Sequence, residues 1–208
     1  RLAKTAGWQR LDERRKQCDR VEFKFDQLNK LAAGQDRPAF IFAHFLMPHP
    51  PFVVNEDGSC LSEKAARSRS RAENYLGQVR YTNRQLLALV QAIRARKDRP
   101  AIIILQADEG PWPARIAGDE HTVGMDTTPV HWRDLGAAEL LEKQAIFHAI
   151  SLPDASVPLA ADMTPVNTFR LIFRHWFGAD LPPLPDESYI YLDNGRVFGF
   201  QRITEKLR

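Results

Sequence analysis

The 208-residue sequence has only two cysteines, Cys18 and Cys60, which excludes a fold built on a framework of disulfides. Neither belongs to a Cys-x-x-Cys pair, so the two residues form either one bridge or none. The sequence also lacks an apolar run long enough to cross a bilayer, and it shows no signal peptide. Because it begins at Arg1 rather than Met, we expect a piece of a longer protein, so the missing signal says little about location.

Charge of one sign is not in excess either. The 29 Lys and Arg residues are mixed with 26 Asp and Glu residues, giving a net charge of +3 and a pI near 9.0. This mixture does not predict a basic stripe for nucleic acid. The 44% hydrophobic and 26% charged residues are ordinary globular composition, without repeats or low-complexity tracts. We expect a single α/β domain over residues 1–208, with residues 1–36 as a charged lead-in.

The stretch around which the chain is organised is residues 100–111, PAIIILQADEGP. Its apolar run does not alternate with polar residues, which is typical of a strand buried on both faces in a parallel sheet. The run ends in Asp108 and Glu109, followed by Gly110 and Pro111. Ligands gather beyond the carboxyl ends of such strands. The two carboxylates therefore form either a metal or catalytic site, because hard cations take paired carboxylates, or a solvated turn.

Two further runs, residues 38–47 and 145–152, are predicted inner strands. Between the first of them and residues 101–107 lies the clearest predicted helix, over residues 72–96. Its apolar stripe comprises Leu76, Val79, Leu86, Leu87, Val90 and Ile93 together with Asn83. Strand, helix and strand make a βαβ unit, so we expect the three strands in one largely parallel sheet with helices on its faces. His44 and His148 lie within two of these strands and are interpreted as core histidines.

His49 follows the first predicted strand, between Pro48 and Pro50. Each proline fixes its own φ and restricts the residue before it, so this imidazole sits on a stiff, extended backbone. The alternative is a surface histidine in a rigid loop. Since parallel strands end at the same edge of a sheet, we expect His49 close to Asp108 and Glu109.

Weaker patterns complete the predicted elements. A helix over residues 23–33, ended by Gly34, is favoured over a short strand, and the long segment after Pro111 is irregular, with His121 and His131 as candidate ligands. The others are a loop over residues 53–70, a short helix over 137–143, a helix over 164–178, and a terminal β-hairpin over 189–202.

Five segments stand in a familiar order: PAFIFAHFLMPHPPF, YLGQVRYTN, IIILQADEGP, AIFHAISLP and TPVNTFRLIFRHWFG. Together they resemble the sulfatase-like branch of the alkaline phosphatase superfamily. That branch includes membrane-anchored sulfatase-like proteins and the phosphoglycerol transferases that make lipoteichoic acid. The resemblance spans residues 26–199 and rests on the order and spacing of the segments rather than on one motif.

The resemblance implies an α/β/α sandwich with a divalent metal at the strand ends. It also implies a Thr, Ser or Cys nucleophile that attacks a phosphate or sulfate ester. Asp108 falls on a metal-ligand aspartate of the family, and Glu109 stands where relatives carry a histidine ligand, which shifts the preference toward Mg²⁺, Mn²⁺ or Ca²⁺. His49 falls near the histidine that contacts the phosphoryl or sulfuryl oxygens, and Arg115 is a second candidate for binding the substrate.

In the relatives, the nucleophile lies upstream of the strand that corresponds to residues 38–47. Only 37 residues precede that strand here, so the resemblance implies the C-terminal portion of an alkaline phosphatase-like domain, truncated on its N-terminal side and without the nucleophile. Two functions follow as expectations. One is part of a metal-dependent hydrolase or transferase for phosphate or sulfate esters at the outer face of a bacterial membrane, held there by an upstream segment. The other is a non-catalytic domain for binding or scaffolding.

Overall fold

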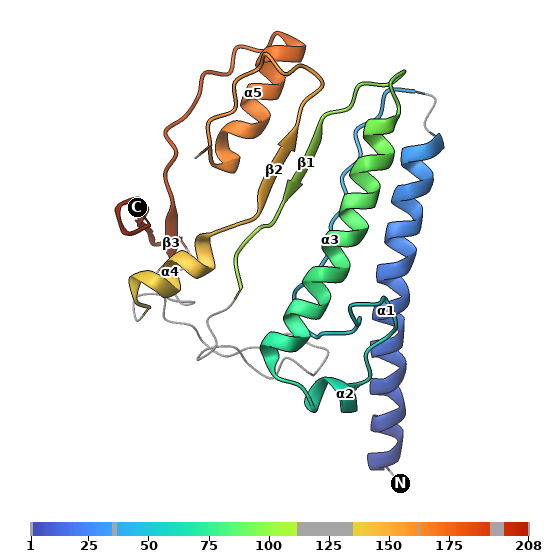
Figure 1. Ribbon diagram of the computed structural model, residues 1–208. Helices are drawn as coiled ribbons and strands as arrows, with labels where there is room; N and C mark the ends of the chain where they lie inside the picture. Colours follow the sequence, from blue (N-terminus) through green and yellow to red (C-terminus); the bar gives the residue numbers. More distant parts are fainter. Residues whose placement is uncertain (1, 35–36, 112–134, 162, 192–197, 208) are drawn as a thin grey trace. The chain divides into compact units, whose positions relative to one another are not determined.

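A computed structural model describes residues 2–34, 37–111, 135–161, 163–191 and 198–207, with side chains from residue 13 onward (Figure 1). The described residues divide into two compact units, the first up to Pro100 and the second from Ala101 onward. The expectation of a single domain stays a prediction. None of the described helices is both long and apolar enough to cross a membrane.

The first unit is built on two long helices, α1 (Leu2–Gly34) and α3 (Arg71–Ala95), which pack along each other (Figure 1). A short helix, α2 (Glu63–Arg67), precedes α3. Ser70 caps α3 by accepting a hydrogen bond from the backbone N–H of Glu73, whose carboxylate accepts one from the backbone N–H of Ser70. This reciprocal capping box satisfies N–H groups that the first turn of a helix leaves unpaired. The main apolar core of the unit joins both helices to the intervening segment through Cys18, Phe25, Val53, Val54 and Tyr81.

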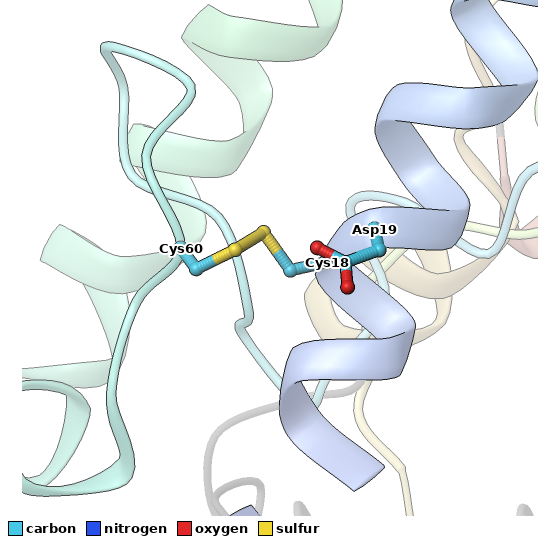
Figure 2. A group of neighbouring side chains, drawn as sticks. All are labelled: Cys18, Asp19 and Cys60. Carbon is cyan, nitrogen blue, oxygen red and sulfur yellow. A yellow bond between two sulfur atoms is a disulfide. The ribbon is translucent and has the colours of Figure 1, made fainter. Parts of the chain in front are cut away.

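A disulfide between Cys18 and Cys60 ties α1 to the segment before α2 (Figure 2). The two residues are 42 positions apart in the sequence, so the bridge closes a long loop. Cys60 lies in a small turn, where Val54 and Cys60 form an antiparallel bridge and the N–H of Leu61 donates to the carbonyl of Val53. Of the two alternatives that the sequence left open, the structure shows the bridged one.

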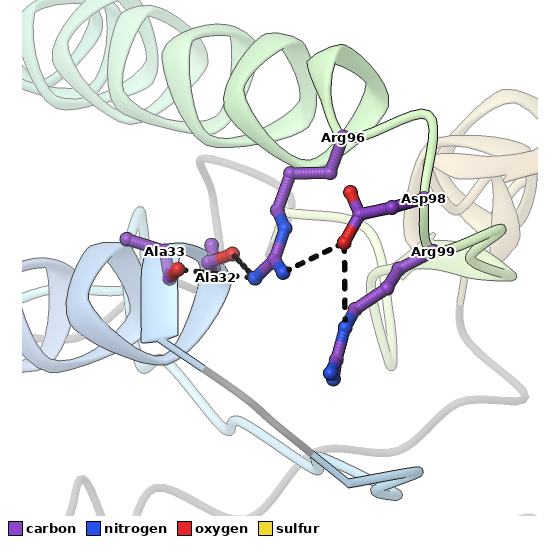
Figure 3. A network of polar contacts seen from close by, with 5 residues as sticks. All are labelled: Ala32, Ala33, Arg96, Asp98 and Arg99. Atoms are coloured by element: carbon purple, nitrogen blue, oxygen red, sulfur yellow. Dashed lines mark hydrogen bonds and ion pairs between the residues drawn. The ribbon is translucent and has the colours of Figure 1, made fainter.

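Arg96 joins the far ends of α1 and α3 (Figure 3). Its Nη1 donates to the carbonyls of Ala32 and Ala33, at 3.3 and 3.0 Å. The last carbonyls of a helix have no partner within the helix, and a cation also interacts favourably with the helix dipole at this end. Nη2 of Arg96 donates to Asp98 at 3.2 Å, and this hydrogen bond holds the pKa of the Asp98 carboxyl below its usual range. Arg99 also approaches Asp98, at 3.6 Å.

The second unit has two small antiparallel sheets. Strand β1 (Ile103–Gln106) pairs with β2 (His148–Ser151), and β3 (Tyr189–Tyr191) pairs with β4 (Phe200–Arg202). In the chain, α4 (Ala137–Gln144) lies between β1 and β2, and α5 (Pro165–Phe177) lies between β2 and β3. A 3₁₀ turn, η2 (Thr204–Lys206), follows β4. A core cluster of Leu135, Leu140, Ile190 and Ile203 joins α4 to β3 and the chain that follows β4.

The structure confirms the predicted helices near residues 23–33, 72–96, 137–143 and 164–178, with α1 extending much further toward the N-terminus. Gly178 ends α5 in the left-handed conformation, with φ of 65°. The terminal hairpin is also confirmed, with shorter strands, and its predicted turn lies outside the described residues. The prediction of a loop over residues 53–70 is wrong where α2 forms. The side chain of Ser62 caps this short helix by accepting a hydrogen bond from the N–H of Ala65.

The prediction of one largely parallel sheet is not what the structure shows. Residues 38–46 are in neither helix nor strand, and the rings of Phe40 and Phe42 are 78% and 80% exposed. Strands β1 and β2 pair antiparallel, with Ile103 opposite Ser151 and Gln106 opposite His148. An apolar run reports a preference for burial, but it does not specify the partner strand or its direction. The connection between β1 and β2 is long enough to return the chain in either direction.

Candidate functional site

His49 closes a tight turn in the first unit. Its backbone N–H donates to the carbonyl of Leu46 at 2.7 Å, and its ring Nδ1 lies 2.5 Å from the carbonyl oxygen of Pro50. A carbonyl can only accept a hydrogen bond, so Nδ1 carries the proton in this arrangement. The side chain is exposed, and Nε2 is therefore the ring nitrogen available to a ligand. The neutral ring accepts a hydrogen bond there, and the protonated ring donates one.

The turn that carries the two predicted carboxylates follows β1 in the second unit. The N–H of Ala107 donates to the carbonyl of Phe147 at 2.8 Å, which continues the pairing of β1 with the chain before β2. Asp108 is exposed, and one of its carboxylate oxygens accepts from the N–H of Glu109 at 3.0 Å. Glu109 forms an ion pair with Lys143 of α4. The Lys143 side chain is only 2% exposed, whereas that of Glu109 is 42% exposed.

Gly110 lets this turn pack directly on the end of α4. Its N–H donates to the carbonyl of Lys143 at 2.7 Å, and Nζ of Lys143 lies 3.4 Å from the carbonyl of Gly110. A Cβ placed on Gly110 would lie 1.9 Å from the carbonyl oxygen of Glu142, a distance that no side chain tolerates. Glycine is therefore required here for close approach of two backbones. The sequence left a solvated Asp-Glu-Gly turn as one alternative, and the structure shows a turn whose Gly110 packs against the end of α4.

The described residues fit a divalent cation only in part. Asp108 offers an exposed carboxylate, but the carboxylate of Glu109 already faces an ammonium group, and a hard cation takes six or more oxygen ligands. Within the described part of the chain, three potential ligand atoms come together only at Cys18, Asp19 and Cys60 (Figure 2). There the two sulfurs are bonded to each other and do not act as thiolate ligands.

The other predicted site residues have different outcomes. Arg115, His121 and His131 lie outside the described residues. His49 belongs to the first unit and Asp108 to the second, so the expectation that they lie close together stays a prediction.

The two histidines interpreted as core residues also differ in outcome. His44 is exposed, so its interpretation as a core histidine is wrong, and its carbonyl accepts from Lys24 at 2.8 Å. His148 is half-buried, with Nε2 3.1 Å from the hydroxyl of Thr168. The Thr168 hydroxyl cannot serve as a nucleophile that attacks an ester, because this residue is only 1% exposed.

A comparison with protein families identifies the chain. The family model described as Sulfatase matches residues 9–132, more than half of the sequence. The chain belongs to the sulfatase family. This membership implies an alkaline phosphatase-like α/β fold, and members of the family generally use a divalent metal. No curated protein and no solved structure matches the chain.

Sequence reasoning missed the face of α3 that is buried. Leu76 and Leu87 of the predicted apolar stripe are 47% and 59% exposed, while the buried positions of α3 are Asn74, Gln78, Tyr81, Thr82 and Leu89. The polar members are buried because they bind backbone groups, as Asn74 does when it donates to the carbonyl of Ala66 at 2.8 Å. The four-residue spacing of Asn74, Gln78 and Thr82, which places them on one face of a helix, was visible in the sequence, but apolar periodicity gives such residues no weight.

Proposed function

We propose that this chain is part of a sulfatase-family hydrolase or transferase that acts on phosphate or sulfate esters, and that His49 contacts the anionic oxygens of the substrate. The observation that carries the proposal is the exposed His49 ring, whose Nδ1 faces the carbonyl of Pro50 and whose Nε2 is left to a ligand. A protonated imidazole held in this way donates from Nε2 to an oxyanion, which stabilises charge that develops in the transition state. Arg115 is proposed as a second group that binds the anion.

Asp108 is the described residue proposed to hold a divalent metal, Mg²⁺, Mn²⁺ or Ca²⁺. Such a metal, when bound, stabilises negative charge on the ester oxygens. The exposed carboxylate of Asp108 supports this role because it is hydrogen-bonded within its own turn and keeps oxygen lone pairs for a cation. Glu109 contributes negative charge beside it, although its ion pair with Lys143 competes with a metal for that carboxylate.

A non-catalytic role in binding or scaffolding is the second candidate. The observation that favours it is the same ion pair, since the Lys143 ammonium group faces the carboxylate that the resemblance implied as a metal ligand. Under this alternative, the chain keeps the family fold and binds an anion or a partner without turnover.

We also propose that the protein works outside the cytoplasm, at the outer face of a bacterial membrane. The disulfide between Cys18 and Cys60 supports this location, because structural disulfides persist in oxidising compartments and are rare in the cytosol. A protein isolated from its native source with both thiols free would contradict the location without affecting the proposed chemistry.

The test uses the 208-residue chain with uniform ¹⁵N and ¹³C labelling, so that both the histidine rings and the backbone of the turn after β1 are observed. Titration with inorganic phosphate and, separately, sulfate is expected to shift the ring signals of His49 with saturation in the millimolar range, a binding free energy of about −4 kcal/mol. His44, which is also exposed, serves as the internal control and should not move. The anion that binds more tightly indicates the class of ester.

Two variants complete this experiment. His49→Gln should abolish the saturable binding, and Asp108→Asn should abolish the selective broadening that Mn²⁺ causes in signals from the turn after β1. Hydrolysis of p-nitrophenyl phosphate or sulfate that is lost in His49→Gln would establish the enzyme directly. If neither anion moves His49 and Mn²⁺ broadens nothing selectively, the substrate-binding role of His49 and the metal-binding role of Asp108 are both wrong.

A further inference from the structure

Gln78 is a fully buried amide in the second turn of α3, with no exposed surface. Its Oε1 accepts hydrogen bonds from the N–H groups of Val53 and Val54, at 2.9 and 3.3 Å. Its Nε2 donates to the carbonyl of Pro48 at 3.3 Å. A single side chain therefore binds the backbone on both sides of the turn that carries His49.

We infer that Gln78 is a positioning residue for His49, closing the segment from Pro48 to Val54 into a loop that carries the exposed imidazole. This inference deepens the proposed function and rests on it for its consequence in substrate binding. The hydrogen bonds themselves do not depend on it. Because Pro48 directly precedes His49, fixing the carbonyl of Pro48 fixes the peptide plane from which the His49 backbone departs.

The amide is chemically suited to this role. The loop presents two N–H donors at one end and a carbonyl acceptor at the other, and among uncharged side chains of this length glutamine supplies both a strong acceptor and a donor. A methionine has a similar shape and makes neither of these bonds well. The amide also carries no charge, so it holds the loop without placing a fixed charge beside the His49 ring.

A second side chain, from α1, also anchors the part of the loop that follows Pro51. Nη2 of Arg14, on α1, donates to the carbonyls of Phe52 and Leu61, at 2.5 and 3.1 Å. Phe52 itself is only 1% exposed. Burial lowers the pKa of the Arg14 guanidinium, and the nearby charge of Glu63 partly offsets this shift. These contacts hold the chain after Pro51, whereas the bond from Gln78 reaches the residue directly before His49.

The positioning role has a consequence for the imidazole that can be measured. The hydrogen bond from Nδ1 to the Pro50 carbonyl selects one tautomer of the neutral His49 ring. A histidine free of such a contact favours the other tautomer, with the proton on Nε2. If Gln78 keeps the loop closed, its removal releases this contact, and the ring then loses the orientation that the contact sets.

The experiment compares Gln78→Met with the matched control Asn74→Ala in the full chain. Asn74 is also a buried amide on α3, but its bond goes to Ala66 rather than to the His49 loop. We expect the ¹⁵N ring signals of His49 to report the Nδ1–H tautomer in the unmodified chain and in Asn74→Ala, and a mixture of tautomers in Gln78→Met. Phosphate or sulfate binding at His49 should weaken by roughly tenfold in Gln78→Met, the equivalent of one ordered hydrogen bond.

Each outcome decides the inference. An unchanged tautomer in Gln78→Met overturns the positioning role, and so does an equal change in Asn74→Ala, which would indicate general destabilisation. If the unmodified chain binds neither anion, the proposed function fails, while the tautomer still decides whether Gln78 positions the ring. Should Gln78→Met not fold, amide exchange in the unmodified chain provides the test. Slow, matched exchange at Val53 and Val54 supports the closed loop, and rapid exchange at either one overturns it.

Discussion

Removing the Cys18–Cys60 disulfide should destabilise the first unit by about 4 kcal/mol. The change to make is the double substitution Cys18→Ala and Cys60→Ala, because Cys18 is only 4% exposed and a serine there would bury a hydroxyl. The cross-link joins residues 42 positions apart. For a closed loop of about that length, the entropy that the bridge removes from the unfolded chain corresponds to roughly 4 kcal/mol at 25 °C.

The substitution also removes two sulfur atoms from the core that contains Phe25, Val54 and Tyr81, and this packing loss must be separated from the cross-link. The unmodified protein in its reduced form provides that separation, since it keeps both sulfurs and lacks only the bond. The difference in stability between the oxidised and the reduced protein measures the contribution of the cross-link. The difference between the reduced protein and the double variant measures the contribution of packing, which we expect at about 1 kcal/mol.

The assay is native-state hydrogen exchange, followed by mass spectrometry on peptides from α3 and, separately, from α5. Exchange localises the effect, because α3 belongs to the unit with the disulfide and α5 does not. The opening free energy of α3 peptides should fall by about 4 kcal/mol on reduction, or to the limit of full exposure if the unit unfolds. A change below about 1 kcal/mol would refute the reasoning and indicate that the unfolded chain already keeps these segments together.

Three further predictions concern single residues. Gly110→Ala should destabilise the second unit by about 1–3 kcal/mol or more in urea unfolding, because the new methyl group meets the Glu142 carbonyl, and a neutral result would show that the turn can move away. Glu109→Gln should lower the free energy of unfolding by about 3 kcal/mol and Lys143→Met by about 1 kcal/mol. The first substitution leaves a buried cation, whereas the second leaves a half-exposed carboxylate, and equal losses of stability would contradict this asymmetry. The Arg96 bond lowers the folded-state pKa of Asp98, so its stabilisation is complete above the ordinary aspartate value of roughly 3.9 and is lost as the pH falls through the lower folded value. Thermal melting of α1 and α3 from about pH 5 to pH 2 should show this pH-dependent loss of stability in the unmodified chain but not in Asp98→Asn. The same pH profile in both proteins would exclude a contribution from Asp98.

The sequence by itself determined the positions of α3, α4 and α5, and the family. The residues that end α5 act locally, so Pro165 and Gly178 mark its two ends without any knowledge of the fold. The order of the short segments around His49 and Asp108 was sufficient to indicate the sulfatase family, which the family model then showed. These features depend on nearest neighbours in the chain, and for that reason they can be read from it.

Only the tertiary structure decided the pairing of the strands and the surroundings of the site residues. The direction of β1 relative to β2 depends on contacts across a long connection, and the apolar runs of the two strands fit either direction. Lys143 meets Glu109, and Gln78 meets Pro48, across separations of 34 and 30 residues, where no local pattern links the partners. The bond between Cys18 and Cys60 is of the same kind, since two cysteines in a sequence allow a bridge but only the packing of α1 against the following segment brings their sulfurs together.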